Sequence, residues 1–354
     1  MSRVACLPKM GDYHVPLNHL IGRTLNCKTI GCLPITKKTV EIGAKHSPDT
    51  VCTPFKIVMG QFIEALERGA NCFIMPAFGC RLGFYDILHK QVLEDLGYKF
   101  EMLTLFDYIA STNKMFASLS SYNPELTREK FDEVLSFIAQ IVMDMDWMGN
   151  HIRRNAGFEV NKGEFEKNYM KYLAEAAKLE NKEAAITLGE KYKKLFNEIK
   201  IDKPEKPIRI GLVGDLYTVI EPHGNCEIVK WLIGNGVEVV SKFDLTYLAA
   251  TMFNIPALIE KSGGYVDYNI GGSANNNIAL AYEFVNNGID GIIHMKAETC
   301  TPEITAMTIL QNISSDFGVP FMYLTFGTET GEAGMHTRWE AFLDMVKMRR
   351  EEND

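Results

Sequence analysis

Apolar residues in the first third of the chain alternate between short unbroken runs and runs with helical spacing. The unbroken runs RVACL, CFIMPAF and KFEMLTL have the length of buried parallel strands. Between them, the segments FKIVMGQFIEALERG and FYDILHKQVLEDLG have apolar residues spaced roughly three or four positions apart, as on one face of a helix. This alternation predicts a parallel sheet covered by helices.

A second series of the same kind fills the C-terminal part. Its predicted strands are IRIGLVG, VEVV, DGIIHM and VPFMYLT, and its predicted helices cover residues 225–234, 274–287, 302–317 and 337–348. Between the two series the chain is charged and helix-favouring, and DKPEKP at 202–207 is typical of a boundary. We therefore predict an α/β fold with parallel-sheet domains at residues 1–126 and 206–354, and a helical insert and linker at residues 127–205.

Composition narrows the class of protein. The chain has 354 residues, of which 46% are hydrophobic and 23% charged, as expected for two globular domains. Its net charge of -8 disfavours a nucleic-acid partner, because that affinity needs clustered Lys and Arg. No apolar run approaches the roughly 18 residues of a membrane span, and the N-terminus lacks an apolar signal core. We expect a cytoplasmic protein with no membrane association.

The chain contains eight cysteines, which stay reduced in a cytosol and so point to metal or redox chemistry. Cys52 and Cys300 each precede Thr-Pro and an amphipathic helical pattern, in VCTPFKIVMGQFIEAL and TCTPEITAMTILQNI. Thr is a good N-cap and Pro suits the first helical position, so both cysteines are predicted to lie just before a helix N-terminus. There the helix dipole favours the thiolate, the form that ligates metal.

Cys80 also precedes a helical pattern, in the loop AFGCRLG that follows a predicted strand. Such loops line the crevice at the carboxyl ends of parallel strands, so Cys52, Cys80 and Cys300 could converge on one cleft between the domains. The alternative for any single cysteine is a small buried hydrophobic side chain. That alternative suits the remaining cysteines better, with Cys27 and Cys32 as a reserve pair for metal: Cys6, Cys27, Cys32, Cys72 and Cys226.

Several segments around these cysteines carry a family resemblance. They are EIGAKHSPDTVCTPFK (41–56), IEALERGAN (63–71), GCRLGFY (79–85), IGLVGDLYTVIEP (210–222), and ETCTPEI followed by TGEAGMHTRWEAFLDM. In this order they resemble the superfamily of the 2-hydroxyacyl-CoA dehydratase D-component, which includes the double-cubane cluster proteins and activase-related proteins of the CoA-protein activase type.

The resemblance implies paired Rossmann-like domains and a 4Fe-4S cluster bound by Cys52, Cys80 and Cys300. Whether the cluster is single or doubled into an 8Fe-9S double cubane stays open, as does a part for Cys27 and Cys32. The resemblance also implies a separate activator ATPase of the actin-like, sugar-kinase-like class. This chain has neither G-x-x-x-x-G-K-[ST] nor G-x-G-x-x-G, so ATP hydrolysis is expected on that partner.

Two further residues are candidates for catalysis. Glu221 follows the loop after IGLVG and could handle a substrate proton or tune the cluster; its alternative is a solvated loop carboxylate. Arg81, next to Cys80, could stabilise cluster charge or bind an anionic substrate, and a surface ion pair is its alternative. His294, near the end of a predicted strand, is weighed as a donor to the cluster and as a core histidine.

Three functions remain open from the sequence. The first is a reductase component that takes low-potential electrons from the activator ATPase and reduces a small substrate or a metalloprotein. The second is a subunit of a 2-hydroxyacyl-CoA dehydratase, a radical lyase that uses the same electron input. The third is a docking module for the ATPase without a cluster. A homodimer, or a heterodimer with a related subunit, is expected.

Overall fold

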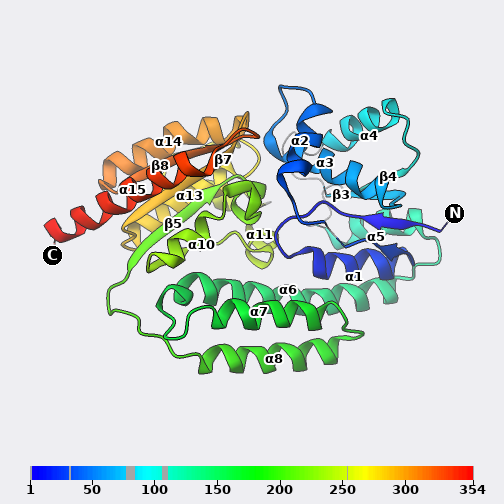
Figure 1. Ribbon diagram of the computed structural model, residues 1–354, viewed down its shortest axis with the longest axis horizontal. Coiled ribbons are helices and arrows are strands. Elements are labelled where there is room, and N and C mark those ends of the chain that lie inside the picture. Colours follow the sequence, from blue (N-terminus) through cyan, green and yellow to red (C-terminus); the bar gives the residue numbers. More distant parts are fainter. Residues whose placement is uncertain (1, 32, 77–83, 106–110, 253, 354) are drawn as a thin grey trace. The chain divides into compact units, whose positions relative to one another are not determined.

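The computed structural model describes residues 2–31, 33–76, 84–105, 111–252 and 254–353 (Figure 1). The backbone divides into two compact units. Unit 1 consists of Met1–Met148 and Glu166–Glu198, and unit 2 consists of Gly149–Phe165 and Ile199–Asp354. No helix in the described part of the chain has the length and apolar character that crossing a membrane requires.

In its described residues, unit 1 contains a four-stranded parallel sheet with the order β2-β1-β3-β4. Its strands are β1 (Val4–Cys6), β2 (Lys28–Thr29), β3 (Cys72–Pro76) and β4 (Glu101–Leu105). Its sheet helices are α1 (His14–Thr24), α2 (Lys37–Lys45), α3 (Thr53–Glu67), α4 (Tyr85–Asp95) and α5 (Thr112–Tyr122). The sequence pattern predicted β1, β3, β4, α3 and α4. It missed β2, because a strand of two residues leaves no apolar run to detect.

Unit 2 repeats this arrangement with a four-stranded parallel sheet of order β6-β5-β7-β8. Its strands are β5 (Ile208–Gly214), β6 (Val237–Val240), β7 (Gly291–Ala297) and β8 (Phe321–Phe326). Its helices are α9 (Leu216–Ile220), α10 (Ile228–Gly234), α11 (Leu245–Thr251), α12 (Ile255–Glu260), α13 (Ala274–Asn286), α14 (Thr301–Phe317) and α15 (Glu332–Asn353). Short 3-10 helices lie at Ala156–Phe158 and His223–Asn225. All four of these strands were predicted.

The two sheets share one strand order, in which the first strand lies between the second and the third. In each sheet the second strand is therefore added on one side of the first strand, and the third and fourth strands are added on its other side. In open parallel sheets, ligands bind beside the point where the strand order reverses in this way, at the carboxyl ends of the strands. The predicted α/β class with two Rossmann-like parallel-sheet domains is confirmed.

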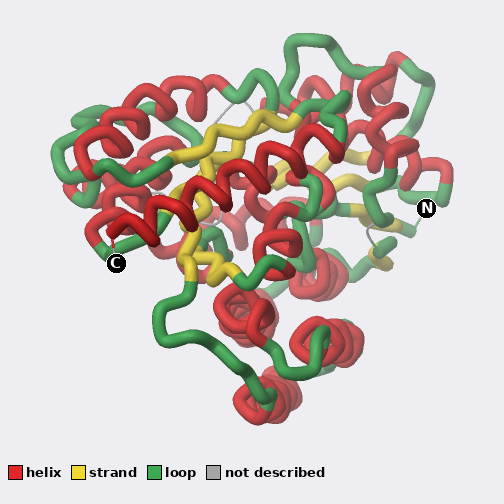
Figure 2. Tube along the Cα trace, turned by 60° about the vertical axis from the view of Figure 1, so that its left-hand side comes forward, coloured by secondary structure: helices red, strands yellow, loops and turns green. Residues whose placement is uncertain are grey.

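Helices cover both faces of the sheet in unit 2 (Figures 1 and 2). On one face, the Phe284 ring of α13 occupies the space beside Gly211 of β5, and α13 packs against α14. On the other face, Phe342 of α15 lies against Gly291 of β7, and the indole rings of Trp231 and Trp339 join α10 to α15 with centroids 5.5 Å apart. Unit 2 is a three-layer α/β/α sandwich.

Three helices fill the charged stretch between the two predicted strand series: α6 (Arg128–Asn155), α7 (Glu164–Ala176) and α8 (Lys182–Glu198). They lie side by side in both views (Figures 1 and 2). The buried Asp144 of α6 accepts hydrogen bonds from Gln140 and pairs with Lys193 of α8 at 2.6 Å. Gly189 permits this close packing, because a β-carbon there would lie 2.2 Å from the Asp144 carboxylate.

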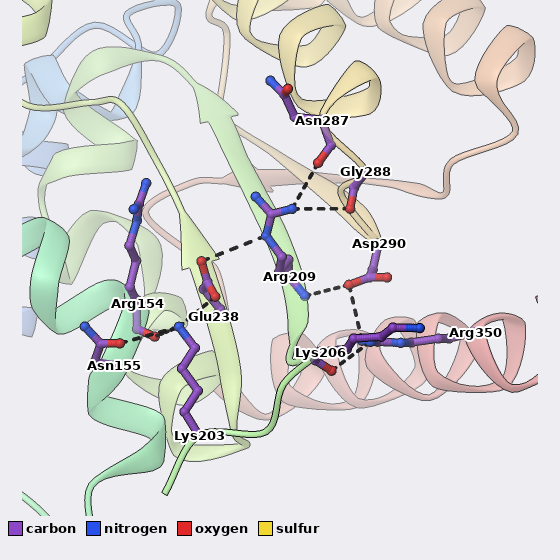
Figure 3. Close-up of polar contacts among 10 residues, drawn as sticks. All are labelled: Arg154, Asn155, Lys203, Lys206, Arg209, Glu238, Asn287, Gly288, Asp290 and Arg350. Carbon is purple, nitrogen blue, oxygen red and sulfur yellow. Dashed lines mark hydrogen bonds and ion pairs between the residues drawn. The ribbon is translucent and has the colours of Figure 1, made fainter. Parts of the chain in front are cut away.

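A polar network ties the linker to the amino end of the sheet in unit 2 (Figure 3). Glu238 of β6 pairs with Lys203 at 2.8 Å and with Arg209 of β5 at 3.9 Å. Asp290 accepts from the Arg209 backbone N–H at 2.7 Å and pairs with Arg350 of α15 at 3.6 Å. Parallel sheets bind their ligands at the opposite, carboxyl end, so we read this network as structural.

Candidate functional site

Cys52 and Cys300 occupy the N-cap positions of α3 and α14. Both residues have φ −72° and an extended backbone, and Pro54 and Pro302 stand in the first turns of the helices that follow. The predicted helix starts are confirmed. The predicted N-cap residues, Thr53 and Thr301, are wrong by one position, because both are already the first residue of their helix. Each sulfur therefore belongs to the cap itself, where the positive end of the helix dipole favours an anionic ligand atom.

The described cysteines differ in exposure and in local structure, and no two of them form a disulfide. Cys6 and Cys72 are buried in strands, as predicted, and burial raises the pKa of the Cys72 thiol to about 12. Desolvation also raises the pKa of Cys27, which lies just before β2. Cys27, Cys52, Cys226 and Cys300 are all partly exposed, and of these Cys52 and Cys300 are the N-caps of long α-helices. Partial exposure at a helix N-terminus is the setting of a ligating cysteine, whereas burial in a strand suits a small hydrophobic residue.

Three residues of the predicted site region lie outside the described residues: Cys32, Cys80 and Arg81. Among the residues that are described, no group of three or more His, Cys, Asp or Glu side chains is arranged to hold a metal ion. The convergence of three cysteines therefore stays a prediction.

The strand order shows which cysteines occupy equivalent places in the two units. Cys80 lies in the sequence between β3 and α4, and Cys300 lies between β7 and α14, so both follow the third strand of their sheet. Cys52 precedes the third strand, at the start of α3, and its counterpart in unit 2 is Ser273, the N-cap of α13. The Cys-Thr-Pro repeat in the sequence thus does not coincide with the repeat in the fold.

A buried polar cluster lies at the carboxyl end of the sheet in unit 2. Glu303, in the first turn of α14, accepts hydrogen bonds on Oε2 from Asn277 Nδ2 at 2.7 Å and from His294 Nε2 at 2.8 Å. The Asn277 amide also bonds both backbone groups of Gly214, at 2.9 and 3.1 Å. Asn277, His294 and Glu303 are all 0% exposed. The cluster joins the end of β5, the first turn of α13, β7 and α14.

Asp215 extends this arrangement at the end of β5. Its carboxylate accepts from the backbone N–H of Ala297 at 2.6 Å and of Thr218 at 3.0 Å. Desolvation raises its pKa, the Glu303 carboxylate adds to that rise, and the hydrogen bonds oppose it. Gly214 is required beside it, because a β-carbon there would lie 1.9 Å from the Met295 carbonyl oxygen. The loop leading to Cys300 is thus fixed at Ala297.

Unit 1 has a corresponding contact between α3 and α4, the helices that precede and follow its third strand in the sequence. His89 of α4 is fully buried and bonds the Phe55 carbonyl oxygen in the first turn of α3 at 3.0 Å. Its ring stacks on the Phe55 ring with centroids 3.8 Å apart. Burial lowers the pKa of His89 to about 4, so the ring is neutral at neutral pH. In each unit, a buried polar contact fixes the helix start that carries a candidate cysteine.

Glu221 is fully buried, which excludes the solvated loop carboxylate. It is the C-cap of α9, and its Oε1 accepts from the backbone N–H of His223 at 3.3 Å. Cys226 and Glu227 follow in consecutive left-handed conformations, with φ 55° and 57°. The catalytic role of Glu221 stays a prediction.

Sequence reasoning missed Asn277, Glu303, Asp215 and His89 as members of these clusters and weighed only His294. A faint signal existed, since an acid three residues after an N-cap often caps a helix, as Glu303 stands relative to Cys300. Comparison with known proteins adds no assignment: no protein-family model matches the chain, and no curated protein matches it significantly.

Proposed function

We propose that the chain binds a 4Fe-4S cluster through Cys52, Cys80 and Cys300 and works as a reductase component that receives electrons from a separate activator ATPase. The supporting observation is that the two described cysteines of this set cap helices and are partly exposed. Thiolate sulfur is the ligand that iron–sulfur clusters require. The donor type and its helix-terminal setting therefore fit the cluster.

When bound, such a cluster supplies one-electron transfer at low potential. The protein's own residues have three tasks in this proposal. Cys52 and Cys300 provide thiolates that helix N-termini stabilise, and the loop before Cys300 is anchored through Ala297 to Asp215. Glu221, buried on α9, is the proposed proton-handling group. The activator is proposed to hydrolyse ATP, since the sequence has no phosphate-binding glycine motif of its own.

The proposal is tested by purifying the full chain without oxygen and measuring iron and acid-labile sulfide per chain. Cys300→Ala should lose most of the iron. Cys226→Ala is the matched control, because Cys226 is also partly exposed, lies in the same unit and stands near the start of α10, yet is not a proposed ligand. Equal iron in the two variants would refute the ligand assignment, and a colourless wild-type protein would refute the cluster.

A second measurement separates the reactions. Reduction of the cluster only when activator and ATP are both present supports the reductase component. If an added 2-hydroxyacyl-CoA loses water, the reductase component is rejected in favour of the dehydratase subunit.

A further inference from the structure

Glu303 is a buried carboxylate in an unusual position for one that only caps a helix. It stands in the first turn of α14, three residues after Cys300, yet its Oε2 is bonded to side chains from α13 and β7. Its Oε1 and His294 Nδ1 are both buried, and neither has a hydrogen-bond partner among the residues that the structure describes. Leaving such atoms unpaired costs free energy, so the arrangement calls for a compensating purpose.

The bonds around Glu303 form a continuous chain from the sheet to the cysteine. Gly214 at the end of β5 is held by Asn277, Asn277 donates to Glu303, and Glu303 belongs to the turn that Cys300 caps. Within that turn, the Ile304 N–H bonds the Cys300 carbonyl oxygen at 3.1 Å. The position of the Cys300 backbone is therefore tied to the sheet through Glu303.

We propose that Glu303 is a positioning residue that fixes the first turn of α14 and thereby sets where the Cys300 sulfur lies. The inference rests on the proposed function only in taking Cys300 as a cluster ligand. Asn277 and His294 orient the Glu303 carboxylate, and neither of them is proposed to contact Cys300 directly.

Hydrogen exchange of the full, cluster-free chain tests the positioning by itself. Glu303→Ala should speed exchange in residues 301–305 by about tenfold or more, as loss of hydrogen bonds to a buried charged group does, and leave the C-terminal half of α14 unchanged. Glu303→Gln should restore most of the protection, because its amide oxygen still accepts from Asn277. Glu298→Gln is the matched control: it removes an exposed acid two residues before Cys300, and exchange should stay within about twofold of wild type.

The chain with its cluster bound gives a second measurement. Glu303→Ala should lower the iron content and alter the electron paramagnetic resonance spectrum of the reduced cluster, and Glu303→Gln should restore both. Should Glu303→Ala fail to fold, Asn277→Ser, which breaks the link to α13, should give the same local increase in exchange.

Uniformly faster exchange along α14, or exchange in Glu303→Ala no faster than in Glu298→Gln, would overturn the positioning role. A wild-type chain without iron would refute the proposed function and leave the exchange experiment intact, so the two failures are distinguishable.

Discussion

Acid should weaken unit 1 through His89, the buried ring that joins α4 to the first turn of α3. Burial lowers the pKa of His89 in the folded chain to about 4, from an ordinary value of 6.5. Between these two values the unfolded chain takes up a proton that the folded chain excludes. The contribution of His89 to stability is thus fully present above pH 6.5 and is lost as the pH falls toward 4.

The size of this loss follows from the two pKa values. Each unit of difference corresponds to about 1.4 kcal/mol, so a shift from 6.5 to about 4 can cost about 3 kcal/mol in full. At pH 5 most of the unfolded chains but few of the folded ones carry the proton, and the loss is about 2 kcal/mol. That is a large fraction of the stability of an ordinary domain.

Urea unfolding of the full chain at pH 8, 7, 6 and 5 measures this loss, with hydrogen exchange of α3 and α4 assigning it to unit 1. His89→Gln keeps a donor for the Phe55 carbonyl but cannot titrate. The variant should be less stable at pH 7 by about 1 kcal/mol, because the ring stacking is lost. Between pH 7 and pH 5 it should lose about 2 kcal/mol less than the wild type.

The difference between pH 8 and pH 7 is the internal control, because His89 is mostly neutral in both the folded and the unfolded chain over this range. The stability of both proteins should therefore change by nearly the same amount between these two pH values. Parallel pH profiles for wild type and His89→Gln down to pH 5 would show that the ring is not desolvated as the structure has it.

Two further predictions concern packing and thiol reactivity. Gly60→Ala should lower the free energy of unfolding in urea by about 3 kcal/mol, because the new β-carbon would lie 1.9 Å from the Thr39 carbonyl oxygen of α2. Gly22→Ala is the control, because the nearest atom to its β-carbon would be 3.4 Å away. This variant should change the free energy of unfolding by less than about 1 kcal/mol. Cys72, with its pKa raised to about 12, should resist iodoacetamide at pH 8 in the folded, cluster-free chain while Cys300 reacts, as peptide mass spectrometry would show. Equal labelling of the two would contradict the burial of Cys72.

The architecture was predictable from the sequence wherever strands are long and buried. β7 is buried along its whole length and β5 over most of it, and both are unbroken apolar runs in the sequence. The short β2 and the short helices α9, α11 and α12 leave too few residues to show a period, and they were missed.

The local setting of the candidate site was only partly predictable. Thr-Pro located the starts of α3 and α14 to within one residue, because capping is a local property of the chain. The Asn277–Glu303–His294 cluster depends on tertiary pairing between residues far apart in sequence. Asn277 and Glu303 also resemble ordinary polar residues of a helix surface until the fold buries them.

The central claim is that Cys52, Cys80 and Cys300 bind a four-iron cluster. Mössbauer spectroscopy of the full chain, produced with Mössbauer-active iron and purified without oxygen, tests it most directly. We predict the quadrupole doublets of a cubane, with one iron distinct from the three bound by cysteine. A spectrum of mononuclear iron alone, or a chain without bound iron, would contradict the claim.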